Sequence, residues 1–424
     1  MIAQLAAIAA VSATMSAPPN NPVNGTVNVR QYGAKGDGTG DDTAAFQAAM
    51  AALGKEGGTV EAPRGTYRFA GHLEMPANIT IAGAWQSVPA HNGVRDKGFP
   101  KPGDDGTTFL ITENAGKEDG APFITLNTNC TLKGVLLYYP DQKPDTEPTP
   151  YPWAIAMRGK NPAVTDVEML NPYNGIDASQ NERHLIRNVQ GQPIRRGVYI
   201  DSIYDIGRLE NIHFNPWWSM TPTLYDWQMA HGEAFIFGRT DWQYVLNTFC
   251  FGYKVGYHFM ETKTGSTNGN FLGIGADDCW NAVLVDQSAP FGILITNGEF
   301  TSFHGPNPIE VLVTESHSGS VRFVNCAFWG PCSQIASISG RGTVGFSDCT
   351  FVQWDLQAKD GRPAIIANNG SVLIRGCEFR DNKAQIELGP GVKRAVITGN
   401  IMHGPVKISN KSAGSVKIND NAGD

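Results

Sequence analysis

Two adjacent aspartates, Asp277 and Asp278, stand in the segment GADDCWNAVLVD. Neighbouring carboxyl groups can divide acid and base roles, because the charge of one raises the pKa of the other and keeps it protonated. Glu233 and Asp241 are two further acids, within residues 215–249. If the fold brings one of them close to the aspartate pair, the chain has the carboxyl groups of a general acid–base site. Adjacent aspartates are also common in solvated turns, which is the alternative interpretation.

Residues 215–249 are rich in aromatic and cationic side chains as well. Aromatic rings stack on the apolar faces of sugars, and arginine forms charge-assisted hydrogen bonds with carboxylates. The stretch therefore predicts a carbohydrate-binding cleft, although an aromatic mini-core beneath a loop would use the same residue types. The candidates for substrate binding, in this stretch and elsewhere, are Trp217, Trp218, Trp242, Arg239, Arg195, Lys254, His304 and Tyr173.

The composition argues against a nucleic-acid partner and a membrane span. The 424 residues carry a net charge of −7 without a Lys/Arg run, and no apolar run reaches the ~18 residues that cross a bilayer. Residues 1–17 resemble a secretory signal, with cleavage after Ala13 or Ala17, so we expect a secreted or periplasmic protein. The seven cysteines show no CxxC or Cys/His metal spacing, and we expect buried thiols.

The glycine-rich stretch YGAKGDGTGDDTAAFQAAM, residues 32–50, lacks the patterns of a phosphate loop and of a calcium loop. No GK[ST] triplet follows its glycines, and the closing glutamate of a calcium loop is missing. We interpret the stretch as a connection between a strand and a helix. Asp41 or Asp42 should cap this helix, and Gly57-Gly58 should end it.

A repeat of 20–30 residues runs through the rest of the chain. Its unit is a short turn residue (Asn, Asp or Gly) three positions before a large apolar residue, as in NCAF, DCTF, GCEF and NGEF. This period of short β-rich segments indicates a solenoid with one repeat per coil, whereas a β-propeller needs repeats of about 40–50 residues and a β-sandwich shows hairpin turns. The apolar members, which we call the inner ladder and expect to stack inside, are Met169, Gly191, Phe214, Cys250, Ile274, Phe300, Phe328, Phe351, Phe379 and Met402.

Four positions beyond each ladder member, the chain should be in the turn that leaves the strand. Because coils of a parallel sheet lie about 4.8 Å apart, these positions should form one edge of the solenoid. Asp278 and His304 would then be one coil apart, and the long excursion of residues 215–249 would bring Glu233 or Asp241 near Asp278. The expected edge consists of Tyr173, Arg195, Trp218, Lys254, Asp278, His304, Cys332 and Asp355.

The segment VNVRQYGAKGDGTGDDTAAFQAAMAALGKEGGTVEAPRGTYRF, residues 27–69, resembles the opening of the pectate lyase superfamily, in its rhamnogalacturonase- and epimerase-like branch. The resemblance implies an all-β, single-stranded right-handed parallel β-helix with an N-terminal helical cap. It implies one domain over residues 18–424, with the cap over 27–83, coils over 60–420 and a loop excursion over 215–249. A polysaccharide or oligosaccharide substrate is implied as well.

The aspartate pair is similar to the DD motif of polygalacturonase-type hydrolases, in which paired acids activate water and protonate the leaving oxygen. NPYNGID, which ends at Asp177, resembles their NTD-containing motif, and His304-Gly305 resembles part of their GHG motif. Two departures stand out: the first two motifs lie several coils apart here, and no RIK triplet is present. The resemblance implies a glycoside hydrolase with Asp277 and Asp278 as catalytic residues.

Two other functions stay open at this point. A polysaccharide lyase needs a base and a group that neutralises the uronate carboxylate; His184, Arg187, Arg195 and Arg196 offer these, with calcium as a conceivable cofactor. A non-catalytic glycan-binding β-helix, as in tailspikes and adhesins, would carry aromatic loops without a carboxylate pair. For a hydrolase we expect no cofactor and no metal. The oligomeric state stays open, with a trimer as one option.

Overall fold

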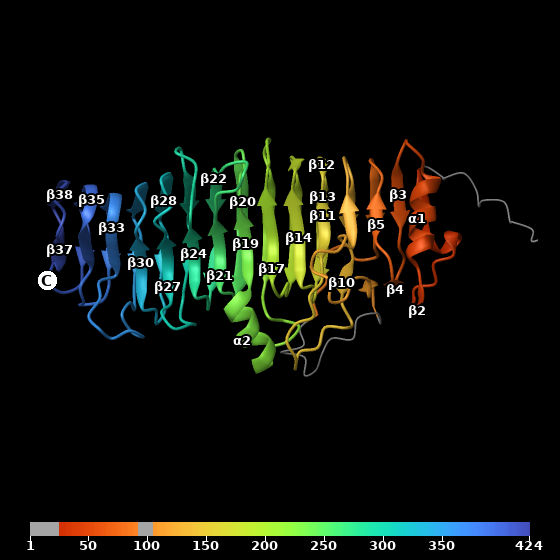
Figure 1. The fold of residues 1–424 in the computed structure, drawn as a ribbon, viewed down its shortest axis with the longest axis horizontal. Coiled ribbons are helices and arrows are strands. Elements are labelled where there is room, and N and C mark those ends of the chain that lie inside the picture. Colours follow the sequence, from red (N-terminus) through yellow and green to blue (C-terminus); the bar gives the residue numbers. More distant parts are fainter. Residues whose placement is uncertain (1–24, 92–104) are drawn as a thin grey trace, which may run out of the picture.

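A computed structural model describes residues 25–91 and 105–424, so the signal predicted for residues 1–17 lies outside the described part of the chain. The strands run across the long axis of an extended solenoid, with the C-terminus at the end opposite α1 (Figure 1). Every pairing between strands in the described residues is parallel. The predicted parallel β-solenoid is therefore confirmed, including residues 290–410, where a β-sandwich would have antiparallel pairs.

Each regular coil passes through three parallel sheets, which we number in chain order. Long strands bend and contribute to two neighbouring sheets. Sheet 1 contains β1 (Thr26–Asn28), β3 (Gly58–Glu61), β6 (Ile79–Ala82), β9 (Thr131–Lys133), the first parts of β13 (Ala163–Met169), β16 (Leu185–Gly191), β18 (Arg208–Phe214) and β20 (Gln243–Phe251), then β22 (Gly269–Leu272), β25 (Ile293–Thr296), β28 (Ser320–Val324), β31 (Thr343–Ser347), the last parts of β33 (Ile365–Arg375) and β35 (Ile386–Thr398), and β38 (Ser415–Asn419).

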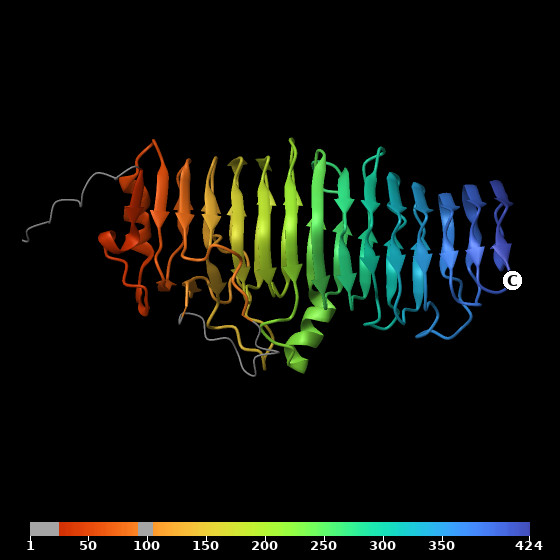
Figure 2. The same ribbon diagram turned by 180° about the vertical axis from the view of Figure 1, so that it is seen from behind.

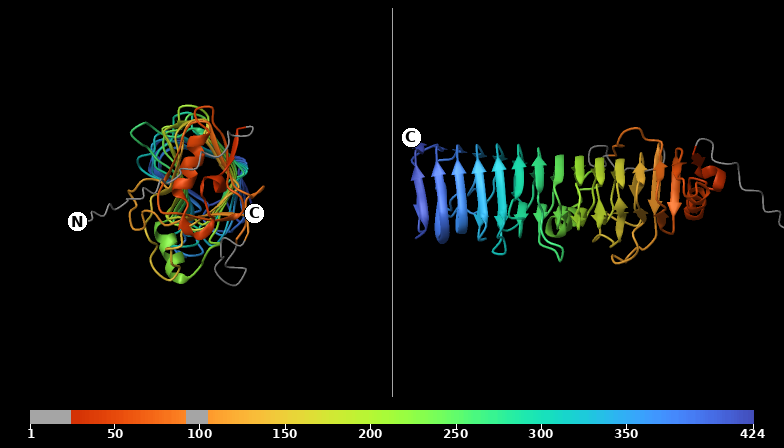
Figure 3. Two further views of the ribbon diagram at one scale, coloured as in Figure 1. Left: turned by 90° about the vertical axis from the view of Figure 1, so that its right-hand side faces the viewer. Right: turned by 90° about the horizontal axis from the view of Figure 1, so that it is seen from above.

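Sheets 2 and 3 complete the tube, whose coils lie one behind another when viewed along the axis (Figure 3). Sheet 2 contains β2 (Asp37–Asp41), β4 (Gly65–Phe69), β7 (Thr107–Ile111), β10 (Leu136–Tyr138), the last parts of β13, β16, β18 and β20, then β23 (Gly275–Asp277), β26 (Glu299–Phe300), β29 (Ala327–Phe328), β32 (Thr350–Phe351), β34 (Glu378–Phe379), β36 (Ile401–Met402) and β39 (Ala422–Gly423). Sheet 3 contains β5 (Leu73–Met75), β8 (Ile124–Leu126), β11 (Trp153–Met157), β14 (Asn174–Ser179), β17 (Arg196–Asp201), β19 (Glu233–Phe237), β21 (Val255–Phe259), β24 (Asn281–Val285), β27 (Ile309–Val313), β30 (Gln334–Ile338), the first parts of β33 and β35, and β37 (Ile408–Asn410). The remaining elements are the short pair β12 (Gly159–Lys160) and β15 (Asn181–Glu182) and the 3₁₀ helix η1 (Val29–Tyr32).

Helix α1 (Thr43–Ala52) stands in the first coil at the place where later coils have a sheet-3 strand. Its Phe46 ring contacts Tyr67, Phe69 and Phe109 edge-on, with ring centroids 5.3, 5.0 and 5.4 Å away. Phe46 is fully buried by these rings. The helix is thus held by the aromatic interior of the first coils.

The ends of α1 differ in detail from the sequence interpretation. Asp41 Oδ1 accepts the N–H of Thr43 (3.1 Å), whereas the carboxylate of the N-cap residue Asp42 turns back and accepts the N–H of Lys35 (2.7 Å). The helix ends at Ala52, and the first left-handed residue after it is Gly54 (φ +61°) rather than the Gly57-Gly58 pair. Glycine favours this left-handed conformation because it has no Cβ.

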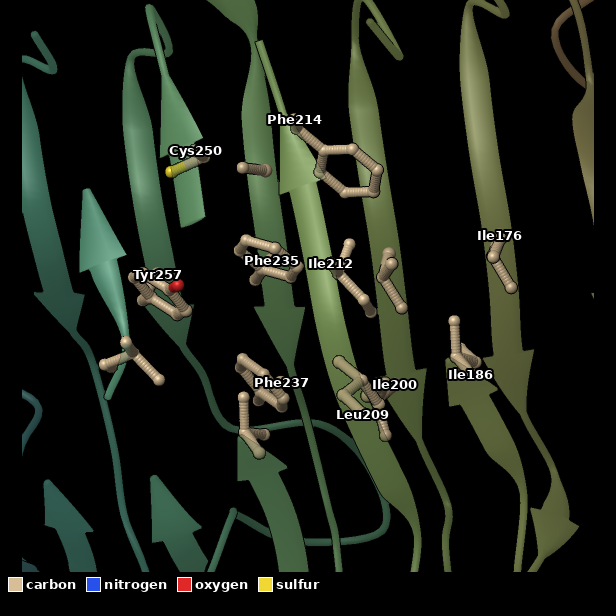
Figure 4. Close-up of a cluster of buried hydrophobic side chains, with 14 of the residues drawn as sticks. Ile176, Ile186, Ile200, Leu209, Ile212, Phe214, Phe235, Phe237, Cys250 and Tyr257 are labelled. Carbon is tan, nitrogen blue, oxygen red and sulfur yellow. The ribbon is translucent and has the colours of Figure 1, made fainter. Parts of the chain in front are cut away.

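The inner ladder is confirmed in the C-terminal half of the solenoid. Phe300, Phe328, Phe351 and Phe379 are fully buried and pair in register, with successive ring centroids 5.3, 5.4 and 4.7 Å apart. Similar stacks continue toward the N-terminus, where Figure 4 shows ladder residue Phe214 and several sheet-3 side chains pointing into the same interior.

The turn residue of the repeat has its own physical role. It adopts a left-handed conformation between sheets 1 and 2, with φ values of +56° at Asn297 and +51° at Asn325, a region that Asn, Asp and Gly tolerate best. The Asn325 amide donates to Asn297 Oδ1 (2.8 Å), so the turns are tied from coil to coil. One ladder member was wrong: Ala276, not Ile274, lies between Cys250 and Phe300. The repeat was defined by a large apolar residue, so it could not identify an alanine at this position.

The excursion predicted over residues 215–249 is only partly a loop. Helix α2 (Pro222–His231) projects from the solenoid (Figure 2), but β19 and β20 then rejoin sheets 3 and 1 in regular register. Glu233 and Asp241 consequently lie at opposite ends of β19, one where the chain enters sheet 3 and the other beyond its end. Within the described residues, neither helix is long and apolar enough to cross a membrane.

The cysteines behave as the sequence predicts. All seven lie in the described part of the chain, and each is a buried, free thiol. Cys326, Cys349 and Cys377 follow the turn residues of consecutive coils, where a small apolar side chain fits the interior.

Phe351→Ala tests the inner ladder. The substitution should lower the free energy of unfolding by about 3–5 kcal/mol, because it removes a buried ring and leaves a cavity between two others. Denaturant unfolding of this variant beside Phe291→Ala, at a phenylalanine that is 73% exposed, gives a matched comparison. A loss below about 1 kcal/mol at Phe351 would contradict the stacking.

Glu310 is an unusual polar residue of sheet 3. It is fully buried, and neither carboxyl oxygen has a hydrogen-bond partner of good geometry among the described residues. Burial raises the pKa of Glu310 well above its usual value, so the carboxyl group stays protonated in the folded protein. In the unfolded chain the same carboxyl group ionises near its usual pKa of 4.5. At neutral pH the folded protein therefore holds one proton more than the unfolded chain does.

Glu310→Gln should therefore change the pH dependence of stability. With a raised folded pKa, wild-type stability falls as pH rises above 4.5, by about 1.4 kcal/mol per pH unit, until the folded carboxyl group ionises. The glutamine variant lacks this loss, so its stability relative to the wild type should rise as the pH increases above 4.5. Urea unfolding across this range measures it, with exposed Glu315→Gln as control. A gap that stays constant with pH would refute the assignment.

Candidate functional site

Four residues that we call the acid–histidine cluster meet where the chain leaves sheet 2 for sheet 3. They are Tyr225, Asp277, Asp278 and His304. Asp277 ends β23, Asp278 follows it in the turn, and His304 comes from the equivalent loop of the next coil. Tyr225 comes from α2, which folds over this edge. The predicted meeting of Asp278 and His304, and of the excursion with this edge, is present.

Asp278 is the centre of the cluster. Its side chain is only 4% exposed; Oδ1 is hydrogen-bonded to His304 Nδ1, and Oδ2 accepts the Tyr225 hydroxyl at 2.5 Å. The His304 side chain remains 42% exposed, and its Nε2 has no partner among the described residues. A buried carboxylate that binds one imidazole nitrogen fixes the ring and leaves the other nitrogen for proton transfer.

Asp277 is set up for the complementary role. Burial, and then the adjacent charge of Asp278, raises the pKa of Asp277. The residue keeps partial solvent access, unlike Asp278. A carboxyl group that holds its proton at higher pH and can still reach a ligand suits a general acid.

Lys254 and Trp280 flank the cluster on the same edge. The Lys254 ammonium lies 5.8 Å from the centroid of the Trp280 ring, within cation–π range. A Cβ at Gly305, beside His304, would come within 2.6 Å of this ring, and Gly305 has a φ of +89°. Glycine is therefore required for Trp280 to pack closely against the histidine loop.

A second polar site, which we call the charged groove, lies on the outer face of sheet 3, in the coils that precede the cluster. Its volume is ≈ 350 Å³. The lining residues are Trp153, Asp177, Arg195, Arg196, Tyr199, Glu233, Ile236, His258 and Met260.

His258 links the acids of the charged groove. Its Nδ1 is 2.9 Å from Glu233, and its Nε2 is 2.9 Å from Asp286. Although burial opposes it, these bonds to Asp286 and Glu233 raise the pKa of His258 to about 9, so the ring is cationic at neutral pH. Arg195 adds a second cation, 3.8 Å from Glu233.

Two aromatic residues line the charged groove as well. The rings of Trp153 and Tyr199 are stacked with centroids 6.1 Å apart, and the Arg196 guanidinium lies 5.8 Å from the Trp153 ring centroid. Arg196 also pairs with Glu118 (3.2 Å), and Asp177 pairs with Arg158. The groove thus presents an aromatic shelf beside fixed charges of both signs.

The predicted site residues separate into three places. Asp277, Asp278 and His304 form the cluster with Lys254 beside them, and Glu233 and Arg195 belong to the charged groove. Glu233 pairs with Val255, and Val255 pairs with Asn281, so Glu233 lies two coils from the strand that follows Asp278, and the predicted contact between them is wrong. The reason is that β19 is a regular sheet-3 strand. Asp241 and Trp242 lie beyond its other end.

Several predicted ligands have other neighbours. Trp218 is 2% exposed in an apolar cluster with Leu224, and Tyr173 is buried against Trp227, with centroids 5.7 Å apart. The mini-core alternative, which concerned residues 215–249, therefore describes Trp218, and Tyr173 packs against Trp227 of the same stretch. Trp217 packs on His213 (4.6 Å), and the Arg239 guanidinium stacks on Tyr204 (4.1 Å), away from the cluster.

The predicted edge and the lyase candidates also need correction. Cys332 is fully buried rather than at a surface edge, and Asp355 accepts backbone N–H groups of its own loop. His184 is buried as well, and burial lowers its pKa to about 3, so it is neutral. Arg187 lies on sheet 1 and pairs with Glu210 at 3.9 Å.

Three residues of these sites escaped the sequence interpretation. Tyr225 was one of many aromatic residues in the excursion, and only the fold of α2 brings it to Asp278. Trp280 is the residue four positions beyond Ala276, so the corrected ladder would have identified it. His258 carries no motif; its signal is the alignment with Tyr199 and Ile236 on successive strands of sheet 3. Within the described ranges no group of three or more His, Cys, Asp or Glu could hold a metal ion.

Comparison with known proteins supports the opening motif. Residues 26–132 match the model of the family described as rhamnogalacturonase A/epimerase, pectate lyase-like. Mannuronan C5-epimerase AlgE5 of Azotobacter vinelandii is 48% identical over 65 residues, 13% of this chain and 6% of that protein. Alginate lyase 7 of the same organism is 48% identical over 65 residues, 13% of this chain and 8% of the relative. The chain therefore aligns with less than a tenth of these relatives.

Solved structures resemble the whole solenoid. The N-terminal fragment of gene product 12 of bacteriophage Phi29 has a TM-score of 0.59 at 14% identity, over 92% of this chain and 72% of that one. The DFA-IIIase of Arthrobacter chlorophenolicus has a TM-score of 0.50 at 12% identity, over 89% and 94%. At these identities the likeness shows the fold alone. The resemblance to the pectate lyase superfamily is thus confirmed: the chain is a parallel β-solenoid that matches the rhamnogalacturonase A/epimerase, pectate lyase-like family over residues 26–132.

Proposed function

We propose that the protein is a glycoside hydrolase that cleaves a polysaccharide at the acid–histidine cluster. The observation that carries the proposal is the double hydrogen bond of buried Asp278, to His304 and to Tyr225, beside an Asp277 whose pKa is raised. The family match and the curated relatives that act on mannuronan and alginate support a carbohydrate substrate.

The proposed step divides the acid and base roles between two residues. Protonated Asp277 gives its proton to the leaving glycosidic oxygen as the C–O bond breaks. His304 Nε2 takes a proton from water, whose oxygen forms the new bond to the anomeric carbon. Asp278 holds the imidazole by Nδ1 and stabilises the imidazolium that forms, while Tyr225 fixes the second oxygen of Asp278. His304, expected from sequence to bind substrate, thus becomes the base.

The charged groove is proposed to hold the sugar units next to the cleaved bond. Sheet-3 strands β19, β21 and β24 are successive coils, so the groove and the cluster lie about two coil spacings, ~10 Å, apart along one edge. Trp153 and Tyr199 supply a stacking surface, while Arg196 and Glu233 supply charge-assisted hydrogen bonds.

A uronate-directed reaction without water is the second candidate. The observation that favours it is the combination of two arginines with a tyrosine, Tyr199, in the charged groove. Arginine can neutralise a uronate carboxylate, and burial together with Asp201 raises the pKa of Tyr199, which keeps its phenol protonated as a proton donor. β-Elimination also needs a base that takes the C5 proton as the C4–O bond breaks and Tyr199 protonates the leaving oxygen. The product would be an unsaturated sugar, and the cluster would then be dispensable.

The finer family features belong to the same proposal. We infer a right-handed coil, because parallel crossover connections are right-handed in nearly all proteins. Helix α1 would cap the first coil, which its packing through Phe46 supports. We expect secretion, because residues 1–17 resemble a secretory signal; detection of the protein in the culture supernatant of its host would check this.

Asp277→Asn and His304→Ala test the catalytic roles. Each should lower the turnover number at least about 100-fold on a polysaccharide that the wild type cleaves, because general acid–base catalysis contributes about 10²–10⁴-fold. New reducing ends measure the activity across a panel of polysaccharides. Asp226→Asn, an exposed acid next to Tyr225 on α2, is the control and should keep full activity.

The same panel separates the alternatives. Ultraviolet absorbance of an unsaturated product would favour the lyase reaction in the charged groove. Binding without either product would favour a glycan-binding module. Undiminished turnover of Asp277→Asn and His304→Ala would refute the cluster as the catalytic site.

Arg196→Ala tests the charged groove. The variant should raise KM about tenfold with little change in kcat, because it removes a stacked cation that contacts bound sugar rather than the breaking bond. Steady-state kinetics on the cleaved polysaccharide measure this split. Arg187→Ala, an exposed arginine on sheet 1, should leave both constants unchanged, and an unchanged KM in Arg196→Ala would exclude this groove from substrate binding.

A further inference from the structure

A second groove, which we call the aromatic groove, lies on the outer face at the beginning of sheet-1 strands β20, β22 and β25. Its volume is ≈ 360 Å³. Asp241 and Trp242 form one wall, Phe291 and Leu294 form the other, and Asn268 and Asn270 lie between them. Neither proposed site of the preceding section uses these residues, because they lie at the sheet 3 to sheet 1 corner, whereas the cluster lies at the sheet 2 to sheet 3 corner.

The aromatic walls are set at a regular spacing. Gln243, Gly269 and Ile293 pair in consecutive coils, so Trp242 and Phe291 stand two coils apart, about 9.6 Å between backbones. Both rings face solvent: Trp242 is 58% exposed and Phe291 is 73% exposed. Large aromatic side chains are normally buried for most of their area, so two exposed rings across one groove indicate a ligand surface.

Trp242 is held outward at a conformational cost. Its φ is +59°, a left-handed conformation that is rare and strained for a bulky side chain. Asn268 Oδ1 accepts the Trp242 backbone N–H at 2.6 Å and stabilises this conformation. Asn268, which lies on the middle one of the three coils, therefore fixes the backbone conformation of Trp242.

The floor and the charge identify the class of ligand. The side chain of Asn270, between the walls, has no hydrogen-bond partner in the described part of the chain, so its amide can bind hydroxyl groups. The eight lining residues include one acid, Asp241, and no cation. Two stacking faces, an amide floor and a carboxylate suit a neutral sugar, and the acid disfavours a uronate.

We propose that the aromatic groove is a second glycan-binding site that takes neutral sugar units. The site goes beyond the proposed hydrolysis, because its residues touch neither the cluster nor the charged groove. The groove would hold a neutral stretch or a side chain of a polysaccharide while the acid–histidine cluster cleaves another part of the same polymer.

Calorimetric titration with hexasaccharides of β-linked glucose, of mannose and of galactose, beside a galacturonate hexamer, tests the proposal. At least one neutral hexamer should bind the wild type, and Trp242→Ala and Phe291→Ala should each weaken binding about tenfold. Trp329→Ala, at an exposed tryptophan directly after β29, should bind as the wild type does. Asp278→Asn should also keep this affinity, which separates failure of the second site from failure of the catalytic proposal.

Two outcomes would overturn the second site. One is that no neutral hexamer binds more tightly than a Kd of about 1 mM. The other is that sedimentation shows an oligomer that Trp242→Ala converts to monomers. The exposed Leu246, Leu272 and Val324 continue along sheet 1 beyond the groove, so a second copy of the chain is the competing occupant that sedimentation would reveal.

Discussion

The stacking of like side chains inside parallel coils is the interaction on which the rest of this molecule depends. Coils that hydrogen-bond in register repeat every ~4.8 Å, which brings each inward side chain into contact with its counterparts above and below. Aromatic pairs such as Phe328 and Phe351 fill this spacing with stacked rings, and a left-handed Asn, Asp or Gly turns the chain between sheets 1 and 2. A register error in one coil would disturb its two neighbours.

The rigid interior leaves the outside of the tube free to vary. Loops at the corner between sheets 2 and 3 differ in length, and the longest carries α2. Since the strands beneath them are fixed, short loops can hold polar groups at defined distances, which is how residues from two coils and one helix meet at Asp278. A buried carboxylate needs such partners, because an unpaired charge in this position would be costly.

Charge is distributed unequally over the solenoid. The charged groove balances arginines and His258 against several acids, so a bound glycan would exchange hydrogen bonds with groups that are already paired. The aromatic groove on the adjacent corner relies on exposed rings and amides instead. If both bind sugars, one face of the tube acts on ionic or strongly hydrogen-bonding units and the other holds neutral ones.

The proximity of Asp278 to His304 was predicted from Ile274, a ladder position that is two residues out of register, so this agreement does not come from the repeat. The repeat in the sequence was, in contrast, enough to predict a parallel solenoid and its interior phenylalanines. The reason is that inward positions and left-handed turns are local constraints that recur in every coil. The error at Ala276 arose where an inward residue is small, and the errors at Trp218 and Tyr173 arose where residue type alone could not distinguish a buried ring from a binding one. Only the tertiary structure decided the neighbours of Tyr225 and Trp242, because the path of an irregular segment depends on packing against other coils. It also decided those of Glu233, because only the fold shows that β19 joins sheet 3 in regular register.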